Sequence, residues 1–296
     1  MFRNKLSLRS REAVTGIAFA ALPLMGFAIF YIVPFGITVA RTFSSGTAGF
    51  IFVGFNTYIS VLNSTAFRLA AGNTFKFIGL GVPLILTLSM GTALLLNTRL
   101  KGGRRLNGVD AFRAAYVLPL ILPAATVVLV FQILFTNGGV FNYALDKLGL
   151  GTVNFLNSGN VFWVMILLYL WKNMGYCIIL LLAGLVQIPE DYYESAGLEG
   201  AGTFIILRKI TLPLMGPTFF FVTLIAIVGS FKSFREAFAL GGNYPHESMY
   251  MLQHFMNNNF ANLNYSRLSV AAVLTFSVIF VFVLVMYLRR GRVGAE

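Results

Sequence analysis

Charged residues are scarce in this chain. They make up 11% of its 296 residues, whereas a soluble domain carries about a quarter. Hydrophobic residues account for 57%, and the mean hydropathy is +0.79. A surface with so little charge cannot stay dissolved in water, so lipid must be the solvent for much of the chain. The composition therefore predicts a membrane protein.

Residues that build disulfides, metal sites and active sites are also few. The single cysteine, Cys177, lies in an apolar run, which excludes an intrachain disulfide and a thiolate metal site. The two histidines, His246 and His254, lack the further ligands that a metal needs. The sequence has no GxxxxGKS or GxxxxGKT phosphate-binding loop and no Ser-His-Asp arrangement. We therefore expect no metal, no cofactor and no enzymatic activity, ATP hydrolysis included.

Positive charge, by contrast, is in excess. The net charge is +12, but the basic residues stand in short clusters between apolar runs, which argues against a nucleic-acid partner. Lys and Arg mark the cytoplasmic ends of membrane helices, and about twice as many fall on one side as on the other. This bias predicts that both termini, including the basic segment 1–16, lie in the cytoplasm.

Six apolar segments are long enough to cross a membrane, for which a helix needs about 20 residues. They must be helical, because backbone polar groups in lipid have to be satisfied within the segment. We predict an all-α, polytopic membrane protein that forms a single domain over 1–296. The six predicted spans are Ile17–Ala40, Phe75–Asn97, Ala114–Phe135, Val161–Val186, Leu212–Phe234 and Leu268–Leu288.

The cytoplasmic segment between the fourth and fifth spans, 187–211, is too polar to enter the membrane. Its sequence, continued to Pro217, is QIPEDYYESAGLEGAGTFIILRKITLPLMGP. Residues Glu190–Leu198 favour a helix with acidic groups in its first turn, where the helix dipole stabilises them. Gly200 and Gly202 are expected to end or bend that helix.

This segment resembles the EAA loop of ABC importer permeases. The family pattern is Glu-Ala-Ala, three residues, Gly, nine residues, Ile, one residue and Leu-Pro. Every spacing is met from Glu194 through Gly200 and Ile210 to Pro213, with Ser195 replacing an alanine and Glu199 an aspartate. The resemblance implies a coupling helix that docks in a cleft of a cytoplasmic ATPase. The alternative is an amphipathic helix packed on its own subunit. The residues assigned to coupling are Glu194, Ser195, Ala196, Glu199, Gly200 and Ala201.

Weaker similarities along the chain point to the maltose-type branch of this family, which carries sugars, polyols and sugar phosphates. The resemblance implies a permease that forms half of a path for a sugar or sugar-like solute. It also implies an external solute-binding protein, two cytoplasmic ATPase subunits and a second, homologous permease, which we expect to be a different chain rather than a second copy. Amino acids, polyamines and phosphate esters remain alternative cargoes.

Two polar clusters inside the spans are candidates for solute contact. Tyr169, Lys172, Asn173 and Tyr176 share one helical face, where rings and amides suit a carbohydrate. Lys172 lies deep in its span, so it is expected to face a cavity, an acidic partner or a solute, or to form an interhelical pair. The resemblance adds a second cluster with Ser230 and Ser233. For each hydroxyl, helix packing is the alternative role.

An ion-coupled secondary transporter is the rival from another class. It predicts acidic residues within spans and repeat symmetry. No internal repeat is visible, and the acidic residues are assigned to loops. Those assigned to loops are Asp110, Asp146, Glu190, Asp191, Glu194 and Glu199.

Overall fold

The computed structural model describes residues 3–45, 50–97, 116 and 118–293 of the chain. Within these residues it has six helical segments long and apolar enough to span a membrane, which confirms the all-α, polytopic prediction. They are Thr15–Thr42, Thr65–Leu96, Ala124–Lys147, Val161–Gln187, Gly216–Gly241 and Tyr265–Leu288. Asp110 and Ala114, where the third predicted span begins, lie outside the described residues.

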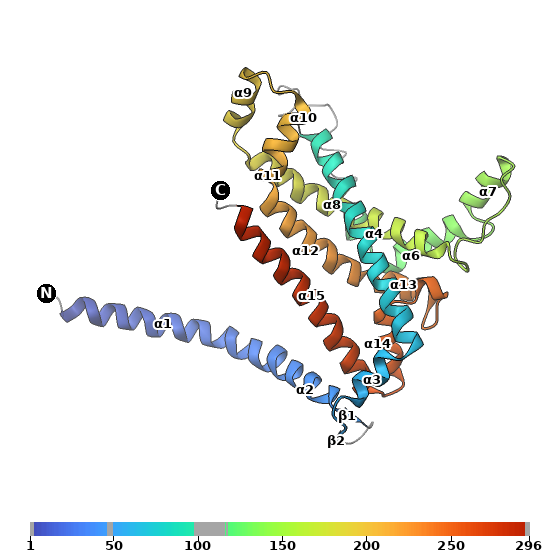
Figure 1. Cartoon of the computed structure of the whole chain (residues 1–296), viewed down its shortest axis with the longest axis horizontal. Helices are drawn as coiled ribbons and strands as arrows, with labels where there is room; N and C mark the ends of the chain where they lie inside the picture. The colour runs from blue at the N-terminus through green and yellow to red at the C-terminus, as the bar shows by residue number, and fades with distance from the viewer. Residues whose placement is uncertain (1–2, 46–49, 98–115, 117, 294–296) are drawn as a thin grey trace. The chain divides into compact units, whose positions relative to one another are not determined.

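Backbone contacts divide the chain into two units, of which the first comprises 1–64 and 259–276. It contains α1 (Arg3–Phe27), η1 (Ala28–Ile32) and α2 (Val33–Thr42), which follow one another without a break (Figure 1). A short antiparallel pair, β1 (Ser44–Ser45) with β2 (Ile51–Phe52), leads to α3 (Asn56–Leu62). The start of α15 (Tyr265–Val293) belongs here and packs Phe276 against Phe35, with ring centroids 5.0 Å apart.

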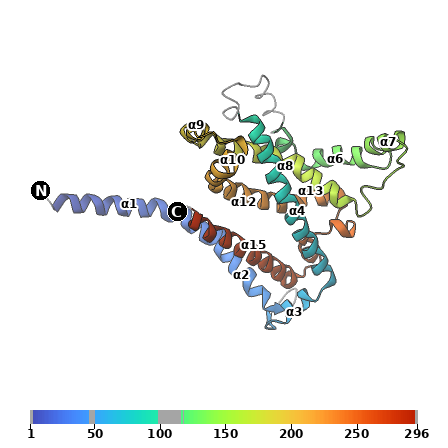
Figure 2. The ribbon, with the colours of Figure 1, turned by 45° about the horizontal axis from the view of Figure 1, so that its top comes forward.

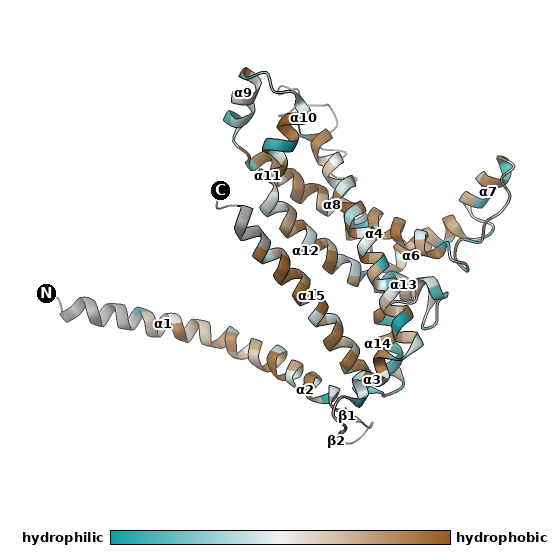
Figure 3. Ribbon diagram, in the orientation of Figure 1, coloured by the Kyte–Doolittle hydropathy of each residue, from teal (hydrophilic) through white to brown (hydrophobic). Residues whose placement is uncertain are grey.

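The second unit comprises 65–258 and 277–296, and its centre is a packed group of three helices. These are α4 (Thr65–Leu96), α8 (Val161–Gln187) and α12 (Gly216–Lys232). Their apolar side chains form one buried core that includes Phe77, Leu181 and Met215. Figure 3 colours these helices mainly as hydrophobic, as lipid and helix packing require.

Shorter helices extend this unit. α6 (Ala124–Phe135) is followed by α7 (Val140–Lys147), and α13 (Phe234–Gly241) continues α12 after Ser233. Beyond α13 come η4 (Glu247–Met249) and α14 (Leu252–Ala261), tied to α4 by Asn73 and Thr74. Between α8 and α12 lie α9 (Glu190–Leu198), α10 (Thr203–Ile206), η3 (Leu207–Thr211) and α11 (Leu212–Leu214), which Figure 2 shows beside one end of the long helices.

Several predicted boundaries were wrong. The second span begins at Thr65 rather than Phe75, and the fifth continues through α13 to Gly241 rather than ending at Phe234. As a result Glu236 lies within a candidate span, so acidic residues are not confined to loops. Asp146 lies on α7, and the acids of the coupling segment lie on α9 or cap it. The single domain over 1–296 stays a prediction.

Candidate functional site: a charged intramembrane cavity and an exposed helix

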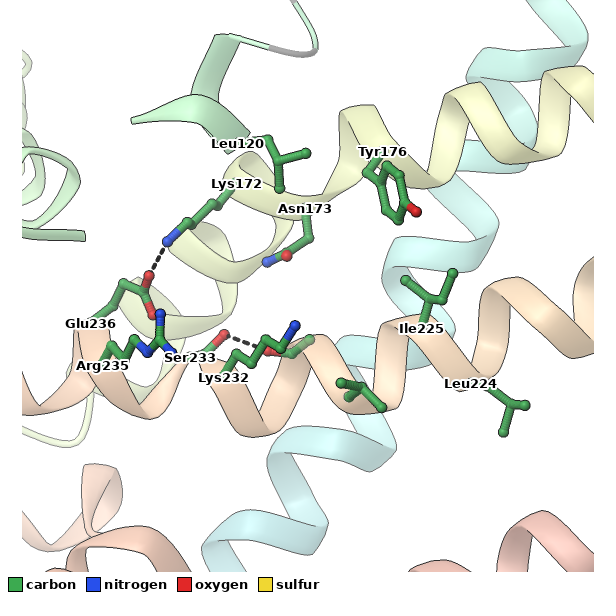
Figure 4. Close-up of a pocket in the computed structure, with 12 residues that line it drawn as sticks. Leu120, Lys172, Asn173, Tyr176, Leu224, Ile225, Lys232, Ser233, Arg235 and Glu236 are labelled. Carbon is green, nitrogen blue, oxygen red and sulfur yellow. Dashed lines mark hydrogen bonds and ion pairs between the residues drawn. The ribbon is translucent and has the colours of Figure 1, made fainter. Parts of the chain in front are cut away.

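A cavity of about 500 Å³ opens between α8 and the junction of α12 with α13 (Figure 4). The junction forms at Ser233, whose backbone stays helical, so the side chains before and after it share one face. The apolar wall includes Leu120, Leu224 and Val228. The polar lining is Lys172, Asn173, Tyr176, Lys232, Ser233, Arg235 and Glu236.

Lys172 and Glu236 form an ion pair across this cavity. The Glu236 side chain is 2% exposed and that of Lys172 is 19% exposed, so the pair stands at the wall rather than in open solvent. The sequence left several roles open for Lys172. In the structure it forms an interhelical ion pair and also lines the cavity. The second carboxylate oxygen of Glu236, Oε2, is buried and has no hydrogen-bond partner.

Asn173 and Tyr176 also line the cavity, as expected for solute-facing residues. Asn173 donates one amide hydrogen bond to the carbonyl of Tyr169, 2.9 Å away, which leaves its amide oxygen toward the cavity (Figure 4). Ser233 lines the cavity too, although its hydroxyl is engaged with the Gly229 carbonyl at 3.2 Å.

Two predicted contact residues lie elsewhere. Tyr169 is fully buried, and its hydroxyl donates to the Ala226 carbonyl on α12 at 2.7 Å. Its ring packs edge-on against Phe77 of α4, which makes it a joint of the three central helices. Ser230 is buried and donates to the carbonyl of Ile227. Tyr169 thus joins two helices, which was the alternative for its hydroxyl, whereas the hydroxyl of Ser230 is used within its own helix, α12.

Three charged residues at the α12–α13 junction were not among the predicted site residues. Arg235 and Glu236 were left out because the span was ended at Phe234, and Lys232 lay inside that span without being assigned to the site. A signal was present: in FKSFREAF the charges recur at i, i+3 and i+4, and the phenylalanines occupy positions between them. That pattern indicates an amphipathic helix rather than a loop.

The predicted coupling helix forms as α9 and ends in a well-defined cap. Gly200 has φ of +76°, a left-handed conformation that favours glycine. The amide of Gly200 donates to the Gly197 carbonyl and that of Ala201 to the Ala196 carbonyl, at 3.0 and 2.9 Å. These two bonds are a Schellman motif, which stops the helix and satisfies its last carbonyls.

Most residues of α9 are exposed within the described chain. Glu194, Ser195 and Glu199 are exposed, and Leu198 is 91% exposed. Ala196 is buried against the chain, and the Tyr193 hydroxyl lies 3.3 Å from the Thr211 hydroxyl. Polar residues of this segment stand out from the apolar helices in Figure 3. A hollow of about 550 Å³ beside α9 is lined by Ser195, Ala196, Glu199 and Ile210.

Comparison with known proteins decides the family. Residues 104–293 match the model of the binding-protein-dependent transport system inner membrane component. The chain belongs to this family. The family expected from the EAA loop is thereby confirmed, and the relatives of this permease are transport permease subunits rather than enzymes.

Curated relatives and solved structures agree with this assignment. The permease is 31% identical over 243 residues to the trehalose/maltose permease protein MalF of Thermococcus litoralis, covering 81% of this chain and 80% of that protein. It is 29% identical to the arabinooligosaccharide permease protein AraP of Bacillus subtilis over 76% of this chain and 71% of the relative. A bacterial ABC transporter that imports the acidic polysaccharide alginate shares the fold, with a TM-score of 0.83, 22% identity and coverage of 97% and 99%.

Proposed function

We propose that this permease forms half of the path by which a sugar or sugar-like solute enters the cell in an ATP-driven importer. The observation that carries the proposal is the cavity beside α8, which presents an amide, an aromatic ring and charged groups within spanning helices. Such a lining suits a polyhydroxylated solute, because rings stack on sugar C–H faces and polar groups satisfy its hydroxyls. The names of the trehalose/maltose and arabinooligosaccharide relatives support the same class of cargo.

The exposed helix α9 is the proposed site of coupling to the ATPase. Its short length, its exposed acidic face and its Schellman cap suit a rigid element that transmits movement without bending. Closure of two cytoplasmic ATPase subunits on ATP would draw the coupling helices together and open the cavity outward. This alternating access needs a second, homologous permease, for which we propose a different chain rather than a second copy.

The proposed topology places both termini and α9 in the cytoplasm of a bacterial or archaeal cell. Its basis is the distribution of Lys and Arg, which are retained on the cytoplasmic side. The opposite side would receive the external solute-binding protein, in keeping with the description of the family.

Reconstitution of the complete transporter tests this function. The chain is purified with the permease, ATPase and binding protein encoded beside it, and ATPase activity is measured in liposomes with and without saccharide-loaded binding protein. We expect saccharide-dependent stimulation in the wild type and its loss in Glu194→Lys on α9. Asp146→Lys, an equal charge reversal on the exposed face of α7, is the matched control and should retain stimulation. Uptake driven by an ion gradient without an ATPase would overturn the proposal.

A further inference from the structure

The cavity beside α8 has an unbalanced charge. Three cationic side chains, Lys172, Lys232 and Arg235, line it together with a single carboxylate, Glu236. Lys172 and Glu236 neutralise each other in their ion pair. Two positive charges therefore remain in the wall of a cavity that lies within candidate spans.

Neither of these two cations has a partner within the described part of the chain. No hydrogen bond or ion pair there involves the side chain of Lys232 or Arg235, and both are exposed. They stand three residues apart across the α12–α13 junction, which places them on neighbouring positions of one helical face. Charges inside a span are costly unless they face water or a counter-charge, so an anion is the missing element.

Glu236 does not supply this counter-charge. Its Oε1 is taken by Lys172, and its Oε2 is buried, so a solute in the cavity does not reach that oxygen. Glu236 therefore neutralises Lys172 and does not balance the charge of Lys232 or Arg235.

We infer that the cavity takes an anionic saccharide, with its carboxylate or phosphate group on Lys232 and Arg235. This inference rests on the proposed function and narrows the solute class. A neutral sugar would leave both cations without a counter-charge.

Uptake of charge-matched probes by the complete reconstituted transporter tests the inference. The probes are digalacturonate against its neutral dimethyl ester, and trehalose 6-phosphate against trehalose, so that the two pairs distinguish a carboxylate from a phosphate. The inference is supported if an acidic probe at low concentration is taken up at least ten times faster than its neutral counterpart. Equal or faster uptake of the neutral members overturns it and leaves the proposed function intact. If no probe is taken up and none stimulates the ATPase, the proposed function fails together with the inference.

Variants of the two cations test the inference independently. The measured quantity is the KM for whichever acidic probe the transporter takes up. Lys232→Gln and Arg235→Gln should each raise its KM about tenfold, the loss of one charge-assisted hydrogen bond. Lys232→Arg should restore most of the affinity, and Lys147→Gln on α7, a cation outside the cavity, should leave the KM unchanged. An unchanged KM in the double Gln variant, with normal assembly, would overturn the inference and assign both cations to lipid head groups or to an acidic partner subunit.

Discussion

Lys172 of α8 and Glu236 of α13 lie 64 residues apart in sequence and meet as an ion pair inside the second unit. The carboxylate is almost fully buried and the ammonium is largely so. The pair therefore fixes the junction of α12 with α13 against α8 and sets the shape of the cavity.

Removing one member of this pair should be worse than removing both. Lys172→Met leaves a buried carboxylate uncompensated, so we expect a loss of about 3 kcal/mol in the free energy of unfolding and a lower thermal midpoint in detergent. The double variant Lys172→Met with Glu236→Met should recover most of that stability, since it removes both charges. Equal midpoints for the single and double variants would contradict a coupled pair.

The pair also shows what the sequence could and could not predict. Six spans followed from hydropathy alone, and α9 followed from the helix-forming residues and early acidic groups of Glu190–Leu198, with its end at Gly200. Glu236 was missed because the fifth span was ended at Phe234, whereas the helix continues through α13 and carries Glu236 within the span. The sequence places Tyr169 on the same helical face as Asn173. It does not show that α12 lies close enough to α8 for the Tyr169 hydroxyl to bond to the Ala226 carbonyl.

Replacing Tyr169 distinguishes a structural role from a solute contact. Tyr169→Phe keeps the ring on Phe77 and deletes only the hydrogen bond to the Ala226 carbonyl. We expect a loss of about 1 kcal/mol in stability with an unchanged KM for the solute. Asn173→Leu, which removes the amide that lines the cavity, is the matched variant and should raise the KM. A raised KM in Tyr169→Phe with unaltered stability would return Tyr169 to the solute site.

Close approach of α8 and α12 depends on Gly184. A β-carbon added there would lie 2.6 Å from the hydroxyl oxygen of Thr218 and 3.0 Å from its β-carbon. Gly184→Ala should therefore cost about 1–3 kcal/mol of overpacking, seen as a lower thermal midpoint. Thr218→Ala in the same chain should relieve it. Gly79→Ala on α4, where a β-carbon meets nothing within 4 Å, should be neutral or slightly stabilising.

The Schellman cap of α9 gives a test of coupling that leaves the cavity untouched. Gly200→Ala forces a β-carbon into a left-handed backbone at a cost of about 1–2 kcal/mol. The end of α9 should then unwind or shift, and solute-stimulated ATPase activity in liposomes should fall several-fold. Gly197→Ala lies three residues earlier in regular helix with open space around it and should keep full stimulation. Equal activity of the two variants would show that the cap does not matter for coupling.

His254 should make the protein less stable in mild acid. Its ring is buried on α14, accepts the Met251 amide through Nδ1 and stacks on Tyr250, and burial lowers its pKa to about 4 from an ordinary value near 6.5. The unfolded chain then binds more protons than the folded one between these values. The stability that the neutral, buried His254 ring contributes is therefore complete above about pH 6.5. It is lost as the pH falls toward 4, by at most about 1.4 kcal/mol per pH unit. Thermal midpoints measured from pH 7.5 to 4.5 should fall less steeply for His254→Gln, which keeps an acceptor but cannot be protonated. Parallel curves for the two proteins would exclude His254 as the source of acid sensitivity.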